Sequence, residues 1–167
     1  MDLYLQKLQD ALAAATRGLT PEELIQHPPG KWSVAEVLEH LYLTYAGTTK
    51  GFARCLEAGT PLASAPTLKQ QFIVAAVTGA GYFPTGRKAP KQTEPRGTPA
   101  EKVVAEIGPQ ISAMDGAIAR CEARYGKRTR LLDHPVLGPL TAQQWRKFHW
   151  VHGRHHVKQI QRLRTSS

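Results

Sequence analysis

The sequence predicts an all-α protein, a four-helix bundle with one or two short additional helices. Three observations predict it: helix-start motifs recur along the chain, apolar residues follow them at helical spacing, and Gly- and Pro-rich stretches separate the patterned segments. A helix with one apolar stripe cannot bury that stripe alone, so four such helices should pack around a shared core. The 167 residues, 41% of them hydrophobic, are the size of one domain, and we expect a single helical-bundle domain over residues 1–167.

Four short motifs carry the features of a helix N-terminus: a capping Thr or Ser and a Glu or Gln three residues later. In two of them a proline occupies the first helical position, which suits its fixed backbone angle and missing donor. In the other two, an apolar residue before the cap can pack on one in the first turn. Because independent features coincide at each motif, we expect a helix to begin there. The motifs are Thr20–Glu23, Ser33–Glu36, Thr98–Glu101 and Thr141–Gln144.

Apolar residues continue these starts every three or four positions, as Leu5, Leu8 and Leu12 do in the first segment. Gly108-Pro109 falls inside the third long helix and should kink or interrupt it, because proline removes a backbone donor and crowds the preceding turn. Long helices are expected at about Asp2–Thr16, Ser33–Ala58, Thr98–Tyr125 and Thr141–Arg164, with shorter ones near Thr20–Gln26 and Thr67–Thr78. Long loops rich in Gly, Pro and basic residues are expected at Gly79–Gly97 and Gly126–Pro139.

The net charge of +9 is the one compositional feature that suggests a partner, because an excess of Lys and Arg can attract nucleic acid. The basic residues are scattered and no nucleic-acid motif accompanies them, so we expect a solvated basic surface and no nucleic-acid partner. No stretch has the length and apolarity of a membrane span, and none has the pattern of a secretory signal. The only cysteines, Cys55 and Cys121, form no CxxC pair, which favours buried structural thiols and a cytoplasmic location.

Histidines on the apolar stripe of the last helix are the strongest functional signal. His152 and His156 are spaced by four and continue the stripe that contains Phe148 and Ile160. Buried imidazoles are costly unless their nitrogens find partners, and two of them one turn apart can share one metal ion. His40 lies on the inner edge of the second long helix and can supply a third nitrogen. The pattern predicts a site for one divalent transition-metal ion at His40, His152 and His156.

Simpler interpretations stand beside this one. Any one of these histidines taken alone is better explained as a core residue that hydrogen-bonds a carbonyl group. His155 also lies near the stripe and is the alternative to His156, although spacing by four favours His156. The remaining histidines, His27, His134 and His149, are expected on the surface or in loops, without a metal role.

Three blocks of sequence resemble the DinB-like (YfiT-like) superfamily of metal-dependent proteins: Lys31–Leu41, His134–Thr141 and His152–Ile160. The resemblance implies an up-down-down-up four-helix bundle, often dimeric, with a metal held by one histidine of the second helix and two of the last. Those positions correspond to His40, His152 and His156. Gln159 stands where some relatives have a further histidine, which leaves its role open.

Three neutral imidazoles leave coordination positions open, as catalytic metal sites do. Several relatives are similar in using a low-molecular-weight thiol, as S-transferases or thiol-dependent isomerases. We therefore expect a metal-dependent transferase that joins a thiol co-substrate to a small electrophile, or a related hydrolase, with no catalytic residue assigned. Zinc and nickel are the favoured metals, although an all-imidazole site also suits copper or iron. The alternative is a non-catalytic, metal-binding homodimer of stress-response type, whose metal holds helices together.

Other chemistries lack support. Gly81–Arg87 resembles a phosphate-binding loop, but Arg87 stands where Lys is needed and no strand precedes it. No GxSxG motif is present for a serine nucleophile. Glu36 and Asp133 could accept hydrogen bonds from metal-bound histidines, although Glu36 fits better as a helix cap.

Overall fold

The computed structural model describes residues 1–79, 81 and 88–165. This part of the chain is mostly helical, with one small antiparallel sheet. The elements are α1 (Leu3–Thr16), α2 (Pro21–Ile25), α3 (Val34–Ala58), α4 (Leu68–Val74), the π-helical turn η1 (Ala75–Gly79), the 3-10 turn η2 (Lys91–Thr93), α5 (Ala100–Tyr125), β1 (Arg130–His134), β2 (Gly138–Thr141) and α6 (Ala142–Thr165). The helical prediction is therefore confirmed in outline, and the all-α description is incomplete.

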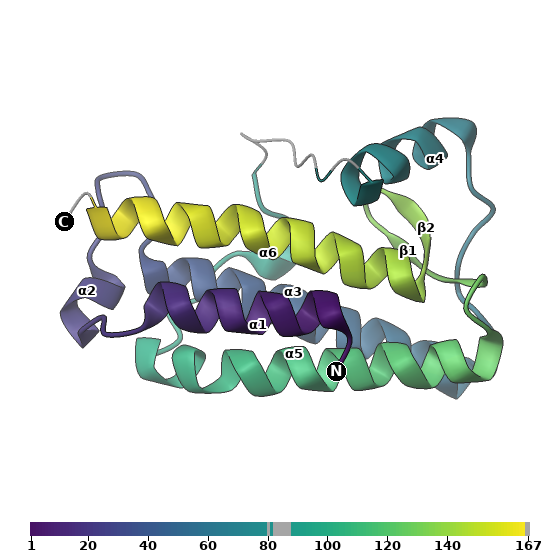
Figure 1. The fold of residues 1–167 in the computed structure, drawn as a ribbon, viewed down its shortest axis with the longest axis horizontal. Helices are drawn as coiled ribbons and strands as arrows, with labels where there is room; N and C mark the ends of the chain where they lie inside the picture. The colour runs from purple at the N-terminus through teal and green to yellow at the C-terminus, as the bar shows by residue number, and fades with distance from the viewer. Residues whose placement is uncertain (80, 82–87, 166–167) are drawn as a thin grey trace.

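The four long helices lie side by side, with α2 at one end and α4 with the hairpin at the other (Figure 1). The closest neighbours are α3 with α5 and α1 with α6. Each contributes its apolar stripe to one continuous core, for example Leu8 from α1, Phe52 from α3, Ile111 from α5 and Ile160 from α6. Each of these four side chains is fully buried. No helix among the described residues has the length and apolarity needed to cross a bilayer.

Three of the four predicted helix-start motifs form the expected reciprocal hydrogen bonds. In the Ser33 motif, the hydroxyl accepts from the Glu36 backbone N–H at 3.2 Å, and the Glu36 carboxylate accepts from the Ser33 N–H at 2.7 Å. The same exchange is present at Thr20 and at Thr141. Two otherwise unpaired donors are thereby satisfied at each helix start.

The fourth motif is different, because Thr98 does not cap α5. Pro99 is the N-cap residue, and it provides no side-chain hydrogen bond. The Thr98 hydroxyl instead donates to the carboxylate of Glu39 on α3. A hydrogen bond to a charged acceptor is about twice as strong as a neutral one, which favours this orientation of the Thr98 side chain.

Two further local predictions differ from the structure. Of the kink or interruption expected at Gly108-Pro109, the interruption is absent, since α5 runs continuously from Ala100 to Tyr125. Pro109 and Ala105, whose carbonyl loses its partner, both lie on the exposed side of α5, where water can replace the lost bond. The expected loop at Gly126–Pro139 contains β1 and the start of β2, which pair with His134 opposite Gly138. Leu131 and Leu140 are fully buried, and this burial stabilises a hairpin too short to give a clear period-two pattern.

The other predicted loop, Gly79–Gly97, contains η2, and within it residues 80 and 82–87 lie outside the described part of the chain. Most of Gly81–Arg87, rejected above as a phosphate loop, therefore lies outside as well. Both cysteines are free and buried, as predicted. The Cys55 thiol donates to the Leu131 carbonyl at 2.9 Å, and burial together with the nearby Cys55 raises the pKa of Cys121 to about 11.

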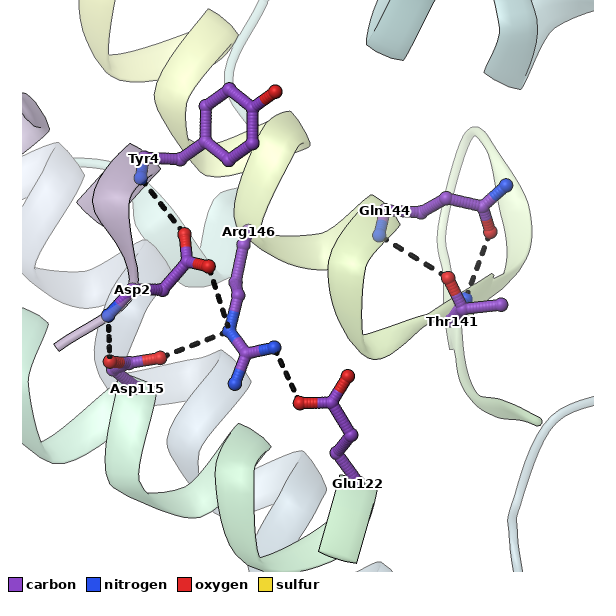
Figure 2. A network of polar contacts seen from close by, with 7 residues as sticks. All are labelled: Asp2, Tyr4, Asp115, Glu122, Thr141, Gln144 and Arg146. Atoms are coloured by element: carbon purple, nitrogen blue, oxygen red, sulfur yellow. Dashed lines mark hydrogen bonds and ion pairs between the residues drawn. The ribbon is translucent and has the colours of Figure 1, made fainter. Parts of the chain in front are cut away.

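A buried ionic cluster joins α1, α5 and α6 (Figure 2). Arg146 is 6% exposed, and its guanidinium donates to Asp115 at 3.1 Å and to Glu122 at 2.7 Å. Asp2 lies 4.0 Å from the same guanidinium and donates its backbone N–H to Asp115 at 2.8 Å. Burial alone would lower the pKa of Arg146, but hydrogen bonds and charges from Glu122 and Asp115 raise it above the ordinary value. Ion pairs to Arg146 therefore link three helices.

Candidate metal centre

His40 is positioned by α3 and by the segment that precedes α5. It lies about two turns beyond the capped N-terminus of α3, is 5% exposed, and donates from Nδ1 to the Thr93 carbonyl at 2.8 Å. The neighbouring residue, Glu39, accepts from the backbone N–H groups of Gly97 and Thr98 at 3.1 and 3.2 Å. Burial would raise the pKa of Glu39, but the hydrogen bonds from residues 96–98 lower it, so it is a carboxylate. Two consecutive residues of α3 thus fix the segment that orients the His40 ring.

His152 and His156 are positioned by α6, whose first turn is fixed by the Thr141–Gln144 motif. Both are buried, at 6% and 7% exposed. Their spacing of four places one imidazole a turn above the other on the inner face. The Nδ1 of His156 lies 3.0 Å from the amide oxygen of Gln159, to which it donates. The role that the sequence leaves open for Gln159 is therefore to orient His156.

The three rings converge on one point. The Nε2 of His152 lies 3.4 Å from that of His40 and 3.1 Å from that of His156. One ligand atom from each of the three lies within 4.8 Å of the other two. Tetrahedral zinc, with Zn–N bonds of about 2.0–2.1 Å, requires nitrogens about 3.3 Å apart. The two measured separations are close to that value.

The hydrogen bond made by Nδ1 of a neutral histidine determines whether its Nε2 carries a hydrogen or a lone pair. Because His40 and His156 donate from Nδ1, each carries a lone pair on Nε2 when neutral. The Nε2 of His152 lies between these two lone pairs and can donate a single hydrogen to one of them. At least one of these two short contacts then lacks a hydrogen of its own, which is unfavourable in a buried site. A cation would satisfy all three nitrogens, so this donor set fits a metal ion.

Electrostatics also favour neutral imidazoles. Burial lowers the pKa of His40, and burial with the nearby His40 lowers that of His156 to about 3. The pKa of His152 lies well below its ordinary value because of burial and its histidine neighbours. Neutral imidazole is the form that binds metals. At neutral pH these rings therefore carry no positive charge that would repel an ion.

Aromatic neighbours limit how far the rings can turn. Trp32 packs on His40 with ring centroids 5.2 Å apart, and Phe148 stacks on His152 at 5.5 Å with only 12° between the planes. The cavity beside the hairpin and the one beside Gly47 are both lined by other residues than His40, His152 and His156. The aromatic neighbours therefore restrict rotation of the rings, and only a small fraction of each histidine is exposed.

Comparison with known proteins places this site within a family. The model of a family described as "Protein of unknown function (DUF1569)" matches residues 1–163. The chain belongs to the DUF1569 family. The match runs from the first helix nearly to the end of α6 and so includes all three histidines. No curated protein and no solved structure matches the chain.

The remaining histidines of this DUF1569 protein test the predictions made for them. His155 is half-buried and lies outside the three-histidine group, whose third member is His156, the residue that spacing by four favours. His27 is exposed, as predicted. His134 lies on β1 instead of a loop, and its Nδ1 accepts from the backbone N–H groups of Val136 and Leu137 at 3.1 Å.

The prediction for His149 is wrong, because its side chain is fully buried. It packs between Tyr45, Trp145 and Phe148, with ring centroids 5.1–5.7 Å away. Burial, with a smaller effect of His134, lowers its pKa to about 3. The sequence spacing does indicate this burial. His149 is four residues after Trp145 and three before His152, so it belongs to the same inner face of α6.

The two acidic residues considered as partners of the metal ligands are used elsewhere. Glu36 caps α3, and Asp133 accepts from the Ser64 backbone N–H at 3.0 Å. The acceptors that do orient the DUF1569 histidines are the Thr93 carbonyl and the Gln159 amide. The contact of Gln159 with His156 could be predicted from the sequence, since the two residues lie three positions apart on the same helix.

Proposed function

We propose that this DUF1569 protein is a metal-dependent enzyme in which His40, His152 and His156 hold one divalent transition-metal ion. The observation that carries the proposal is the convergence of three buried Nε2 atoms, two pairs of them 3.1 and 3.4 Å apart. Zinc and nickel are the proposed ions, because imidazole ligands suit both. Three protein ligands leave coordination positions open, as in catalytic sites and unlike closed structural ones.

The proposal includes membership of the DinB-like superfamily and an up-down-down-up four-helix bundle. It is supported by the chain directions in Figure 1, where α1 and α6 run one way and α3 and α5 the other. The histidines also lie on the second and last of the four long helices, as the resemblance implies. A cytoplasmic homodimer is part of the same proposal, with the free thiols Cys55 and Cys121 consistent with a reducing compartment.

The proposed reaction is transfer of a low-molecular-weight thiol to a small electrophile, or hydrolysis of such a molecule. A bound divalent ion supplies Lewis acidity, which favours the nucleophilic form of a thiol or water at neutral pH. Thr93 and Gln159 accept the Nδ1 hydrogens of His40 and His156, so Nε2 is the nitrogen of each ring that would hold an ion. Trp32 and Phe148 exclude water from the faces of His40 and His152.

Elemental analysis of protein purified without chelators or an affinity tag tests the metal site. Wild type is expected to hold about one equivalent of a divalent metal, and His40→Ala, His152→Ala and His156→Ala to lose it. His27→Ala and His155→Ala are matched controls outside the group and should retain it. Equal metal content in all six proteins, or none after loading with zinc and nickel, would contradict the site.

The reaction has its own test. Metal-loaded wild type is incubated with glutathione, bacillithiol or mycothiol and common electrophiles, and loss of free thiol is followed. Wild type should consume thiol faster than His40→Ala, while His27→Ala should match wild type. If wild type consumes thiol no faster than His40→Ala does, the transferase proposal is wrong. The proposal of a metal site is not affected by that result.

The second candidate function is a non-catalytic bundle of stress-response type, whose metal holds α3 to α6. It is favoured by the low exposure of the three histidines, 5–7%. Water relaxation measured on cobalt-substituted protein separates the two functions. Exchangeable water on the ion supports the enzyme, and a metal without exchangeable water supports the structural role.

A further inference from the structure

A cavity lies between α4 with η1, the β1–β2 hairpin and the first turn of α6. We call it the hairpin cavity; its volume is about 180 Å³. Gln144, which lines it, precedes His152 by eight residues, or about 12 Å along the axis of α6. The cavity is therefore separate from the candidate metal centre. Its volume is below the roughly 300–1,000 Å³ of pockets for drug-sized ligands, so it suits a small molecule.

Part of the cavity wall is apolar. Val74 and Leu137 line it, and both side chains are buried, at 6% and 3% exposed. Pro139 of β2 lines it as well. These groups make no hydrogen bonds with a ligand, so they favour a molecule that has an apolar body.

The polar part of the wall presents hydrogen-bond donors, because of the way two helices are capped. The amide oxygen of Gln144 accepts from the Thr141 N–H at 2.9 Å, and that of Gln70 accepts from the Thr67 N–H at 2.9 Å. With both oxygens used by the backbone, each side chain offers its amide nitrogen as a donor. Figure 2 shows the Gln144 nitrogen turned away from Thr141.

Gly138 fixes the second amide in place. A Cβ at this position would lie 2.5 Å from both Cδ and Nε2 of Gln70, so the amide packs directly on the hairpin backbone. Glycine here also has φ +74°, which other residues rarely adopt. The Gln70 donor is therefore held against the hairpin at the edge of the cavity.

One positive charge completes the wall. Arg130, the first residue of β1, lines the cavity, and no Asp or Glu is found among the described residues that do so. A guanidinium with two amide donors matches the two acceptor oxygens of a carboxylate. We propose that the hairpin cavity binds a small molecule that carries a carboxylate on a short apolar body.

Benzoate is a suitable probe, and benzamide is its uncharged counterpart. Binding to the full-length protein is followed by amide chemical shifts in residues 130–144. The diagnostic variants are Gln144→Glu and Gln70→Glu, which keep the acceptor oxygen for the helix cap but replace the donor with a negative charge. Because Glu at this position also forms a capping box, both variants should fold. Gln143→Glu adds the same charge at an exposed position that does not line the cavity.

Saturable shifts with benzoate are expected in wild type and in Gln143→Glu. In Gln144→Glu and Gln70→Glu, benzoate should bind at least about tenfold more weakly, as should benzamide in wild type. Three results would overturn the proposal: no saturable benzoate shift, equal weakening by Gln143→Glu, or equal binding of benzamide. Neither the expected nor the contrary results depend on a metal at the histidines.

Discussion

The Nε2 atoms of His40 on α3 and His152 on α6 face each other at 3.4 Å, although 112 positions separate the two residues in the chain. His40 is oriented by the Thr93 carbonyl, which lies outside α3, and His152 by stacking on Phe148 of its own helix. The contact between α3 and α6 at this point is therefore polar, and its stability should depend on what the nitrogens bind.

Gln159 should determine how tightly the proposed metal centre holds an ion. Replacement by Leu removes the acceptor of the His156 Nδ1 hydrogen, 3.0 Å away, and leaves that ring free to turn. Loss of such an orienting partner typically weakens metal binding about 10- to 100-fold, so Gln159→Leu should lose affinity by that factor while keeping the stoichiometry. Competition with a chromogenic chelator measures the affinity. Gln161→Leu, at an exposed position of the same helix, should bind as wild type does; equal affinities in both variants would contradict the assigned role.

The parts of the site that the sequence could predict are those encoded within one helix. Spacing by four places His152 and His156 on the same face, and the apolar neighbours Val37 and Leu41 place His40 inward. The acceptor for His40 could not be found in this way. Thr93 lies 53 positions away on an irregular segment, and its carbonyl group carries no residue-specific signal.

The same distinction explains the fold. Helix starts were predicted correctly where the cap and its partner are three residues apart, as at Ser33 and Glu36. The prediction failed at Thr98, whose hydroxyl donates to a carboxylate 59 positions away while Pro99 is the N-cap residue. The buried Arg146 was missed for a related reason: its partners lie 31 and 24 positions away, and an arginine beside Trp145 gives no sign that it will be paired.

Arg146 should contribute strongly to stability. Arg146→Met removes the cation that holds Asp115 and Glu122, and leaves two acidic side chains in largely buried positions. Removing one partner of a buried ion pair costs about 3–5 kcal/mol, so the free energy of unfolding should fall by about that amount. Urea unfolding measures the change. Arg120→Met, at an exposed position of α5, should change it by less than about 1 kcal/mol, and a similarly small change for Arg146→Met would show that the cluster is not stabilising.

Gly153 should be required for the close approach of α6 to α1. A Cβ there would lie 2.1 Å from Leu8 Cδ1 and 3.2 Å from the Tyr45 hydroxyl, so the helices must separate or Leu8 must move. Overpacking of this kind costs about 1–3 kcal/mol, and Gly153→Ala should be destabilised by that amount in thermal or urea unfolding. Gly47→Ala is the control, because a Cβ at Gly47 meets nothing within 4 Å. That substitution should stabilise α3 slightly through the higher helix propensity of alanine.

The double variant tests the cause of that effect. If the clash with Leu8 is responsible, Leu8→Ala combined with Gly153→Ala should be less destabilised than the sum of the two single variants. Additive losses would mean that Gly153 acts through something other than this contact.

His149 should make the protein less stable in acid. Its pKa is lowered from 6.5 to about 3 by burial, and neither ring nitrogen has a hydrogen-bond partner among the described residues. Above pH 6.5 the ring is neutral in both the folded and the unfolded protein, so it does not make the stability depend on pH. Between pH 6.5 and about pH 3 only the unfolded state takes up the proton, so stability falls as the pH falls, by up to about 1.4 kcal/mol per pH unit.

Replacement of His149 by Phe isolates this contribution, because the ring keeps a similar size and loses the titrating group. His149→Phe should have a shallower fall of unfolding free energy with decreasing pH than wild type, and at neutral pH it should be at least as stable, since two unsatisfied nitrogens are removed from the core. His27→Phe, at an exposed position, should keep the wild-type slope. Because the metal ligands are unchanged in both variants, measurements on metal-free protein compare like with like, and identical slopes in wild type and His149→Phe would assign the acid sensitivity to other groups.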